Sequence, residues 1–435
     1  MNISLSPCFS LNGTISVNGD KSISHRALML GAVAQGTTNI SNLSTSEDVA
    51  STERCLKQLG IKITKRQGVT TVQGDGLLGF QKPSLSLDAG NSGTTMRLLT
   101  GLLAGQHFDS ILTGDDSLLR RPMNRILEPL VRMGASIKAT AANYAPLYIH
   151  GSPIFSINYA LPVASAQVKS CLLLAALYAK GTTILRETLT TRNHTELMLA
   201  DFNVSISTSG HTISIEGEQQ PLGTNITVPG DISSASFFIA AALLTPNSTM
   251  IIKNVGLNPT RLGFVRVLQK MDAQIEINPV QSDQKEKFGD LVVRSSSLRS
   301  TTLTADVIPS LIDELPIFAI IATQAKGVTT VTGAKELRYK ESDRLKAITH
   351  NLRRMGVEID ELDDGFIIKG KQELNGAHID SFNDHRIAMA FSIAALIARG
   401  VTTIHDAECI SISMPEFYQL IDSVISKTDY YSTDM

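Results

Sequence analysis

The stretch RALMLGAVAQGTTNI, residues 26–40, decides the fold, because an almost entirely apolar helical segment passes through a glycine turn into a Thr-rich strand. A helix that is apolar on every side has to be buried on every side. The same pattern recurs five more times, at residues 97–112, 171–185, 236–252, 316–331 and 387–404. The chain is therefore predicted to contain six copies of a unit of roughly 70 residues, each with a buried helix.

A second recurring segment is an amphipathic helix that carries charge on one face, as in LKQLGIKI at residues 56–63. Five of these helices run into a residue that tolerates positive φ, followed by an alternating strand, which predicts left-handed helix stops. The stops are Gly60, Gly134, Asn203, Asp272 and Gly356. Each copy is thus expected to have an inner buried helix, an outer helix and strands between them.

Six buried helices cannot share one compact core in a chain of 435 residues, so two domains of three repeats each are predicted. We expect residues 19–228 to form one domain, and residues 1–18 plus 229–435 to form the other. The sixth copy lacks its closing strand, because only the polar tail at residues 427–435 follows it. Residues 2–17 are therefore expected to supply one or two strands to the second domain. The chain would then cross between domains near Gly19 and near Pro229, which would make a hinge.

Composition and charge exclude several classes of protein. Lys and Arg number 39 against 41 Asp and Glu, and a net charge of -2 gives no overall attraction to nucleic acid or to an anionic membrane. The four cysteines have neither disulfide-rich nor zinc-site spacing, which favours a reducing compartment. The N-terminus does not resemble a signal peptide, and the longest apolar runs are shorter than the roughly 18 residues of a membrane span. A cytoplasmic protein is expected.

Polar or small residues precede each buried helix, as in GDKSISHR and FNDHR. If the helices of a domain run parallel, their N-termini emerge together and offer free N–H groups to anions. Basic residues gather at these starts and in nearby loops, although any one of them could be a solvated surface residue or a cap. They are Lys21, Arg26, Arg97, Lys169, Arg386, Arg120, Arg121, Arg192, Arg338, Lys340 and Arg344. As a set they favour small substrates that carry phosphate and carboxylate groups.

Four residues are candidates for acid and base chemistry: Asp313, Glu341, Lys21 and His385. Three of them have an alternative explanation: Asp313 could be an N-cap, Glu341 a surface ion pair on an outer helix, and His385 a structural histidine. No dinucleotide fingerprint, Walker A sequence or HExxH motif is present, so no cofactor and no metal are expected.

Nine stretches match one known family in order and spacing. They are GDKSISHRALML, GNSGTTMRLL, LLRRPMNRI, SAQVKSCLL, TRNHTE, PGDISSASFF, IPSLIDELP, LRYKESDRL and FNDHRIAMAF. With them the chain resembles 5-enolpyruvylshikimate-3-phosphate synthase over its entire length, and GDKS, SAQVK, TRNHTE and NPTR are similar to its second, glyphosate-tolerant class.

The resemblance implies an α/β enolpyruvyl transferase fold of two domains, each with three βαβαββ repeats and buried parallel helices. It implies transfer of the enolpyruvyl group of phosphoenolpyruvate to the 5-hydroxyl of shikimate 3-phosphate, with release of phosphate, in the shikimate pathway to chorismate and the aromatic amino acids. The enzyme is expected to be a monomer without nucleic-acid or membrane partners, whose domains close on shikimate 3-phosphate.

The resemblance also assigns roles to individual residues. Asp313 would take the 5-hydroxyl proton, and Glu341 with Lys21 would serve the vinyl carbon. The residues that would bind shikimate 3-phosphate are Lys21, Ser22, Arg26, Ser165, Ala166, Gln167, Arg192, Asp313 and Lys340. Those that would bind phosphoenolpyruvate are Lys21, Asn91, Gly93, Arg121, Gln167, Glu341, Arg344, His385 and Arg386.

Three positions affect how closely the sequence agrees with this family and with its classes. Ile412 stands where many members have a Lys, so one phosphoenolpyruvate contact would be absent or replaced. Glu336 replaces an Asn of other members, which fits the second class. Gly93 keeps the small residue of glyphosate-sensitive enzymes, so glyphosate tolerance stays undecided.

Three rival functions fit the sequence less well. The sister transferase that acts on UDP-N-acetylglucosamine has a reactive Cys in a loop that here is GDDSLLRRPMN, without Cys. A catalytically inactive binding protein is disfavoured because Lys21, Asp313, Glu341 and Arg386 are all present. An RNA-processing cyclase would need a basic surface, which the charge balance argues against.

Overall fold

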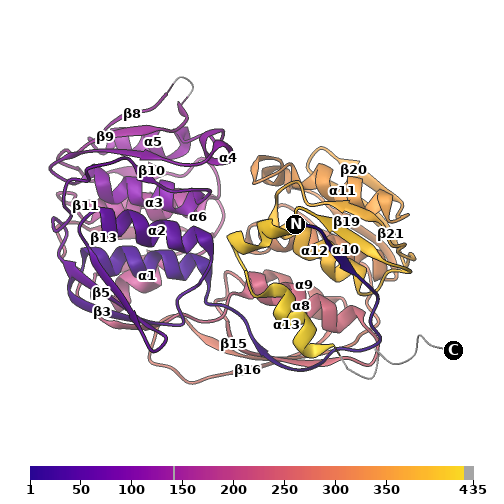
Figure 1. Ribbon diagram of the computed structural model, residues 1–435. Coiled ribbons are helices and arrows are strands. Elements are labelled where there is room, and N and C mark those ends of the chain that lie inside the picture. The colour runs from indigo at the N-terminus through magenta and orange to yellow at the C-terminus, as the bar shows by residue number, and fades with distance from the viewer. Residues whose placement is uncertain (141–142, 426–435) are drawn as a thin grey trace. The chain divides into compact units, whose positions relative to one another are not determined.

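The computed structural model describes residues 1–140 and 143–425, and the polar tail at residues 427–435 lies outside them. Two compact units account for the chain (Figure 1). The first, here called the N-unit, contains residues 19–229 and 282–286. The second, the C-unit, contains, among the described residues, 1–18, 230–281 and 287–425. The periodicity of the sequence gives no sign that Ser282–Glu286 would pack with the N-unit.

All six predicted buried helices are confirmed. In the N-unit they are α1 (Lys21–Val33), α3 (Gly93–Ala104) and α6 (Ala166–Ala176). In the C-unit they are α8 (Ile232–Leu244), α10 (Leu315–Gln324) and α12 (His385–Ala395). Nearly every side chain of these helices is buried, because their apolar residues leave no polar face for water.

The outer helices carry charge on one face. They are α2 (Glu47–Gln58), α5 (Asn124–Arg132), α7 (His194–Asp201), α9 (Gly263–Lys270), α11 (Arg344–Arg354) and α13 (Phe417–Val424), and a short α4 (Asp116–Leu119) precedes α5. The first five end at the predicted stops, whose φ values are 87° at Gly60, 94° at Gly134, 62° at Asn203, 72° at Asp272 and 85° at Gly356. The left-handed stops are therefore confirmed.

Three four-stranded sheets surround the N-unit helices (Figure 1). The first has the order β14 (Asn225–Thr227), β3 (Gln35–Ser41), β5 (Val69–Asp75) and β4 (Lys62–Arg66). The second has the order β6 (Leu87–Asp88), β7 (Asp109–Thr113), β9 (Leu147–His150) and β8 (Ser136–Lys138). The third has the order β10 (Asn158–Ala160), β11 (Thr182–Arg186), β13 (Thr212–Glu216) and β12 (Ile206–Ser209). In each sheet the first two strands are parallel and the last three antiparallel.

The C-unit repeats this arrangement. Its first sheet has the order β2 (Asn12–Ser16), β15 (Thr249–Gly256), β17 (Phe288–Arg294) and β16 (Gln274–Pro279). Its second has the order β18 (Thr302–Leu303), β19 (Gly327–Val331), β21 (Gly365–Gly370) and β20 (Ile359–Leu362). Its third has only β22 (His378–Asp380), β23 (Thr402–His405) and the N-terminal β1 (Ile3–Leu5). The 3₁₀ turns include η3 (Ile312–Glu314), η4 (Lys335–Tyr339) and η5 (Ala407–Ile412).

The N-terminal segment completes the C-unit, as predicted. Strand β2 pairs in parallel with β15, and β1 pairs antiparallel with β23 in place of the missing closing hairpin. Each unit has one hydrophobic core of its own. Among the described residues, no helix has the length and apolar character needed to cross a membrane.

Candidate active site

Side-chain hydrogen bonds join the starts of the three buried helices of the N-unit. Arg97 Nη1 on α3 donates to Gln167 Oε1 on α6 at 2.6 Å, and Gln167 Nε2 donates to Thr94 Oγ1 at 3.0 Å. Arg26 Nη2 on α1 donates to Ser170 Oγ on α6 at 2.6 Å. The predicted meeting of helix starts is therefore confirmed within this unit, and it concentrates free N–H groups that favour anions.

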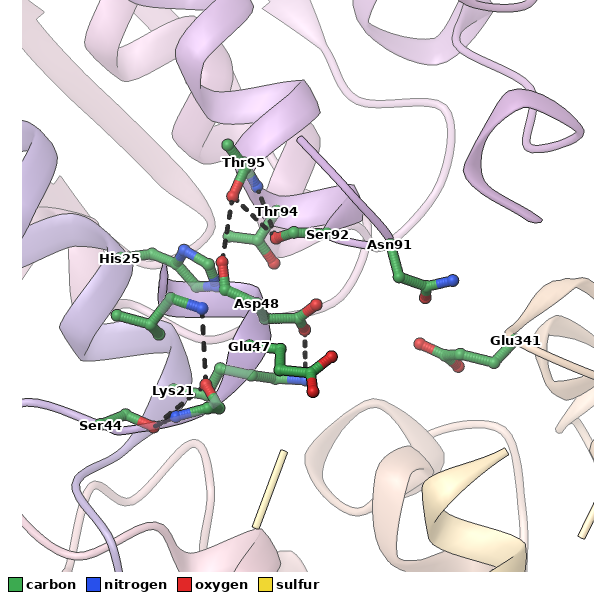
Figure 2. Close-up of polar contacts among 12 residues, drawn as sticks. Lys21, His25, Ser44, Glu47, Asp48, Asn91, Ser92, Thr94, Thr95 and Glu341 are labelled. Atoms are coloured by element: carbon green, nitrogen blue, oxygen red, sulfur yellow. Dashed lines mark hydrogen bonds and ion pairs between the residues drawn. The ribbon is translucent and has the colours of Figure 1, made fainter. Parts of the chain in front are cut away.

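Lys21 begins α1 directly after the capping residue Asp20, whose side chain accepts from Ile23 N at 2.9 Å. Its ammonium lies 2.7 Å from Asp48 Oδ2 in the first turn of α2 (Figure 2). The Lys21 side chain keeps 17% of its surface exposed, so its charge is anchored on one side and accessible on the other. This geometry suits a residue that meets a small anionic ligand.

Behind Lys21, a buried chain of hydroxyl groups connects α1, α2 and α3. His25 Nδ1 lies 2.7 Å from Thr52 Oγ1, which lies 2.7 Å from Thr95 Oγ1. Thr95 Oγ1 in turn donates to Ser92 Oγ at 2.8 Å, and Ser92 caps α3 (Figure 2). Burial lowers the pKa of His25 well below its usual value, and the charges of Lys21 and Arg26 lower it further. His25 is thus a neutral structural residue under the site.

Asn91, Gly93 and Arg121 lie together at the start of α3. Arg121 Nη2 donates to Asn91 Oδ1 at 2.9 Å and to Ser117 Oγ at 3.3 Å. Asn91 Nδ2 donates to Asp115 Oδ2 at 2.8 Å. A Cβ at Gly93 would lie 2.8 Å from Arg97 Nη1 and in ordinary contact, at 3.5 Å, with Arg121 Nη1, so the glycine leaves room for the Arg97 guanidinium group.

The remaining N-unit candidates lie around the starts of α6 and α7. Ser165 caps α6 by accepting from Val168 N at 3.4 Å, and Ala166 is the first residue of that helix. Arg26 is 3% exposed, and its other two nitrogens donate to Thr195 Oγ1 at 2.7 Å and to Ser22 O at 2.8 Å. Burial lowers the pKa of Arg26 to about 10. Arg26 therefore braces the backbone of Ser22.

In the C-unit, Arg344 is the centre of a buried ionic cluster. The residue is 1% exposed, and its guanidinium lies 2.8 Å from Asp384, 2.5 Å from Glu341 and 3.6 Å from Asp313. Burial alone would lower the pKa of Arg344, but Asp384 and Glu341 outweigh burial and raise it above its ordinary value. The cation is permanent and fixed.

Asp313 and the start of α12 complete this cluster. Lys340 Nζ lies 3.4 Å from Asp313 Oδ1, and Arg386 Nη1 donates to the backbone oxygen of Asp313 at 3.0 Å. His385 is buried in the first turn of α12, beside the capping residue Asp384. At the start of α8, Ser233 donates to Glu314 beside α10. The starts of α8, α10 and α12 therefore also meet within the C-unit.

The alternative explanations of two candidates are wrong. Asp313 is not an N-cap, because it lies inside η3 and the N-cap position of α10 is Glu314, which makes no side-chain capping bond. Glu341 is not a surface ion pair on an outer helix, because it precedes α11 and its partner Arg344 is buried. Both carboxylates contact cations at the helix starts.

Two basic residues are each held by a pair of carboxylates. Lys169 is 0% exposed and lies between two carboxylates. Arg338 pairs with Asp343 at 2.9 Å and with Glu361 at 3.0 Å. Ile412 ends η5 and packs half-buried against the C-unit core, so an apolar side chain stands where many relatives are expected to have a cation. Within residues 1–140 and 143–425, no group of His, Cys, Asp and Glu side chains suits a metal ion.

Known proteins resemble this chain over nearly its whole length. Residues 6–421 match a family described as EPSP synthase (3-phosphoshikimate 1-carboxyvinyltransferase). A 3-phosphoshikimate 1-carboxyvinyltransferase from Petrotoga mobilis is 49% identical over 98% of this chain and 100% of that protein. One from Bacillus cytotoxicus is 46% identical over 95% of this chain and 98% of that protein.

Solved structures agree with these matches. An EPSP synthase structure from Acinetobacter baumannii has a TM-score of 0.88 and 41% sequence identity, covering 97% of this chain and 98% of that one. The enolpyruvyl transferase NikO from Streptomyces tendae has a TM-score of 0.79 at 16% identity, covering 97% and 96% of the two chains, which bears on the fold alone.

Proposed function

Because this chain belongs to the EPSP synthase (3-phosphoshikimate 1-carboxyvinyltransferase) family, we propose that its substrates are phosphoenolpyruvate and shikimate 3-phosphate, bound by the helix starts described above. The protein is a carboxyvinyltransferase of the shikimate pathway, which serves aromatic amino acid biosynthesis. The observation that carries the substrate proposal is that each unit has fixed cations at helix starts: Lys21 at the start of α1 and Arg121 beside Asn91 before α3 in the N-unit, and Arg344 at the start of α11 in the C-unit.

The reaction adds the 5-hydroxyl oxygen of shikimate 3-phosphate to C2 of phosphoenolpyruvate while C3 gains a proton. Collapse of the tetrahedral intermediate then breaks the C2–O bond to phosphate, and loss of a proton from C3 restores the vinyl group. We assign Asp313 to the hydroxyl proton, because its carboxylate is held by Lys340 and Arg344. Glu341 and Lys21 serve the proton at C3, since general acids and bases act through positioned groups of this kind.

The surrounding cations stabilise the negative charge that develops on phosphate and carboxylate. Asn91, Arg121, Gln167, Arg344, His385 and Arg386 are proposed to bind phosphoenolpyruvate, with Gly93 leaving the space that it needs. Ser22, Ser165, Ala166, Gln167, Arg192 and Lys340 are proposed to bind shikimate 3-phosphate, with Arg26 supporting Ser22. We further propose a monomer that works in the cytoplasm, a compartment that agrees with its four free cysteines, and chain crossings that act as a hinge.

Phosphate release tests the proposed function directly. The enzyme is given phosphoenolpyruvate with either shikimate 3-phosphate or UDP-N-acetylglucosamine, and free phosphate is measured. We expect release only with shikimate 3-phosphate, and a loss of at least about a hundredfold in kcat for Asp313→Ala or Lys21→Ala. Release with the nucleotide sugar would favour the sister reaction, and release with neither acceptor would overturn the proposal.

A further inference from the structure

Lys169 is among the most deeply buried cations of the N-unit, with 0% of its surface exposed. Its ammonium lies 2.7 Å from Glu196 Oε1 and 3.1 Å from Glu187 Oε1, and both carboxylates are buried as well. Burying three charges costs free energy that an apolar trio of the same size would not. An arrangement of this kind therefore calls for an explanation beyond stability.

The two partners of Lys169 lie at opposite ends of one loop. Glu187 follows directly after β11, and Glu196 lies in the first turn of α7. Between them the chain has no helix or strand, and this stretch contains Arg192. A single ammonium thus fixes both ends of the loop to α6, the helix whose start contains Ser165 and Gln167.

Glu187 also folds the loop back on itself. Its Oε1 accepts from Thr191 N at 3.1 Å and from the Thr191 hydroxyl group. Thr191 is the immediate neighbour of Arg192, so the carboxylate that binds Lys169 also fixes the backbone next to that arginine. Because Thr191 is held, the backbone position from which the Arg192 side chain extends is held with it.

The electrostatics place Arg192 near the start of α1. Burial has the largest effect on the pKa of Arg26 and lowers it, Glu196, Asp20 and Glu286 raise it, and Arg192 lowers it. Glu196, Glu286 and Asp20 thus act on Arg26 together with Arg192, and Glu187 and Glu196 hold Lys169. Arg192 itself is half-buried.

We propose that Lys169 is a positioning residue for shikimate 3-phosphate binding, which acts by clamping Glu187 and Glu196 and so aiming Arg192 at the substrate. The proposal rests on the proposed function, because it requires Arg192 to bind that substrate. Lys169 itself touches no ligand in this scheme. Its effect is confined to the affinity for one substrate and leaves the chemical step unchanged.

The test is a double-mutant cycle on the dissociation constant of shikimate 3-phosphate, measured by titration calorimetry without phosphoenolpyruvate. Glu187→Gln keeps an oxygen for Thr191 but loses the charge that binds Lys169. We expect Glu187→Gln to weaken binding about tenfold, the value of one charge-assisted hydrogen bond. In an Arg192→Ala background, Glu187→Gln should have no further effect, because the residue that it positions is gone. An equal loss in both backgrounds would overturn the proposal.

Steady-state kinetics separate positioning from general damage. With Glu187→Gln, the KM for shikimate 3-phosphate should rise while kcat and the KM for phosphoenolpyruvate stay within about twofold. Glu53→Gln is the matched control, because Glu53 also lies between two ammonium groups, those of Lys57 at 2.8 Å and Lys65 at 2.7 Å, outside the site. The control should leave all three constants unchanged. A parallel fall of kcat in Glu187→Gln would make the clamp merely structural.

Lys169→Met is a stronger variant, with its fold checked by circular dichroism. Where it folds, its shikimate 3-phosphate affinity should fall at least as far as that of Glu187→Gln, and an unchanged affinity would contradict the clamp. The wild-type enzyme separates the two proposals. If it neither binds shikimate 3-phosphate nor releases phosphate, the proposed function fails, whereas normal activity with unaffected variants sinks the positioning role alone.

Discussion

At Gly93 the missing side chain makes room for the guanidinium group of Arg97. An added Cβ would approach Arg97 Nη1 to 2.8 Å, and Arg97 is the donor that binds Gln167 at 2.6 Å. Gly93→Ala should therefore displace Arg97, raising the KM for phosphoenolpyruvate by about tenfold to a hundredfold. Initial rates over a range of phosphoenolpyruvate concentrations check this. A variant with normal KM and normal thermal stability would mean that Arg97 moves aside without effect.

His25 links pH to stability with a definite sign. Burial and the nearby cations keep the pKa of His25 in the folded protein well below 6.5. Near pH 6 the unfolded chain therefore binds a proton at His25, whereas the folded protein does not. The contribution of His25 to the free energy of unfolding is therefore fully present above pH 6.5. Below that value it is lost by about 1.4 kcal/mol per pH unit until the folded-state pKa is reached.

His25→Gln removes this proton. The difference in unfolding free energy between wild type and His25→Gln should therefore shrink by about 1.4 kcal/mol per unit as the pH falls from about 6.5 to about 5. Urea unfolding followed by circular dichroism at several pH values measures it. A difference that stays constant with pH would show that His25 accepts its proton in the folded protein.

The place of a basic residue on a helix could be predicted from the sequence, but the residues that surround it could not. The position of Lys21 at a helix start follows from the repeat, and its contact agrees with that prediction, whereas Arg344 was expected in a loop and is the first residue of α11. Lys169 has the same signature in the sequence, yet it is buried between Glu187 and Glu196, which lie far along the chain. Local spacing gives a helix position but carries no information on which distant carboxylates will enclose it.

At the scale of elements, the outer helices end where the backbone turns left-handed. Asn203 has φ of 62° and an exposed side chain, so its contribution to stability is conformational. Asn203→Val should lower the unfolding free energy by about 1–2 kcal/mol, the cost of that conformation for a residue with a branched Cβ. Asn203→Gly is the matched control and should stay within about 0.5 kcal/mol of wild type, since glycine adopts positive φ without strain. Thermal unfolding measures both, and equal losses would contradict the conformational explanation.

Helices and strands followed from periodicity because the buried helices are apolar all round and the stops favour positive φ. The segments that connect the helices and strands did not follow from periodicity. Asp313 precedes an apolar run, which predicts a helix start at this residue. In the structure Asp313 lies in η3, and helix α10 begins at Leu315, with Pro316 in its first turn. Short 3₁₀ turns have no periodic signal of their own, so the position of a catalytic candidate within one could not be read from spacing.

On the scale of the whole molecule, the repeats are offset from the units that they build. Strand β2 precedes α1 in the chain but pairs with β15 of the C-unit, and β14 precedes α8 but pairs with β3 of the N-unit. The C-unit therefore receives its first parallel strand from the N-terminal end of the chain, and the N-unit receives its own from the end of residues 19–229. Glu286 is a further case of this offset. It lies in the segment between β16 and β17 but groups with the N-unit, where it pairs with His194 at 2.5 Å. A single ion pair of this kind has no signature in the sequence.

This offset makes the two units respond differently to loss of the N-terminus. Residues 2–9 contain β1, which closes the third C-unit sheet against β23, and Ile3 and Leu5 pack on the C-unit core. The N-unit uses none of these residues. Deleting residues 2–9 should therefore lower the unfolding temperature of the C-unit by several degrees, since about 1 kcal/mol corresponds to roughly 2–4 °C for a domain of this size.

Calorimetry combined with hydrogen exchange can assign this loss to one unit. Amides of β23 and β22 should exchange faster in the deletion variant, whereas those of β3 and β5 in the N-unit should keep their wild-type protection. If the amides of both units lost protection equally, the two cores would unfold as one cooperative body. The N-terminal strand would then stabilise the whole chain, and the division into two separately stable units would have to be abandoned.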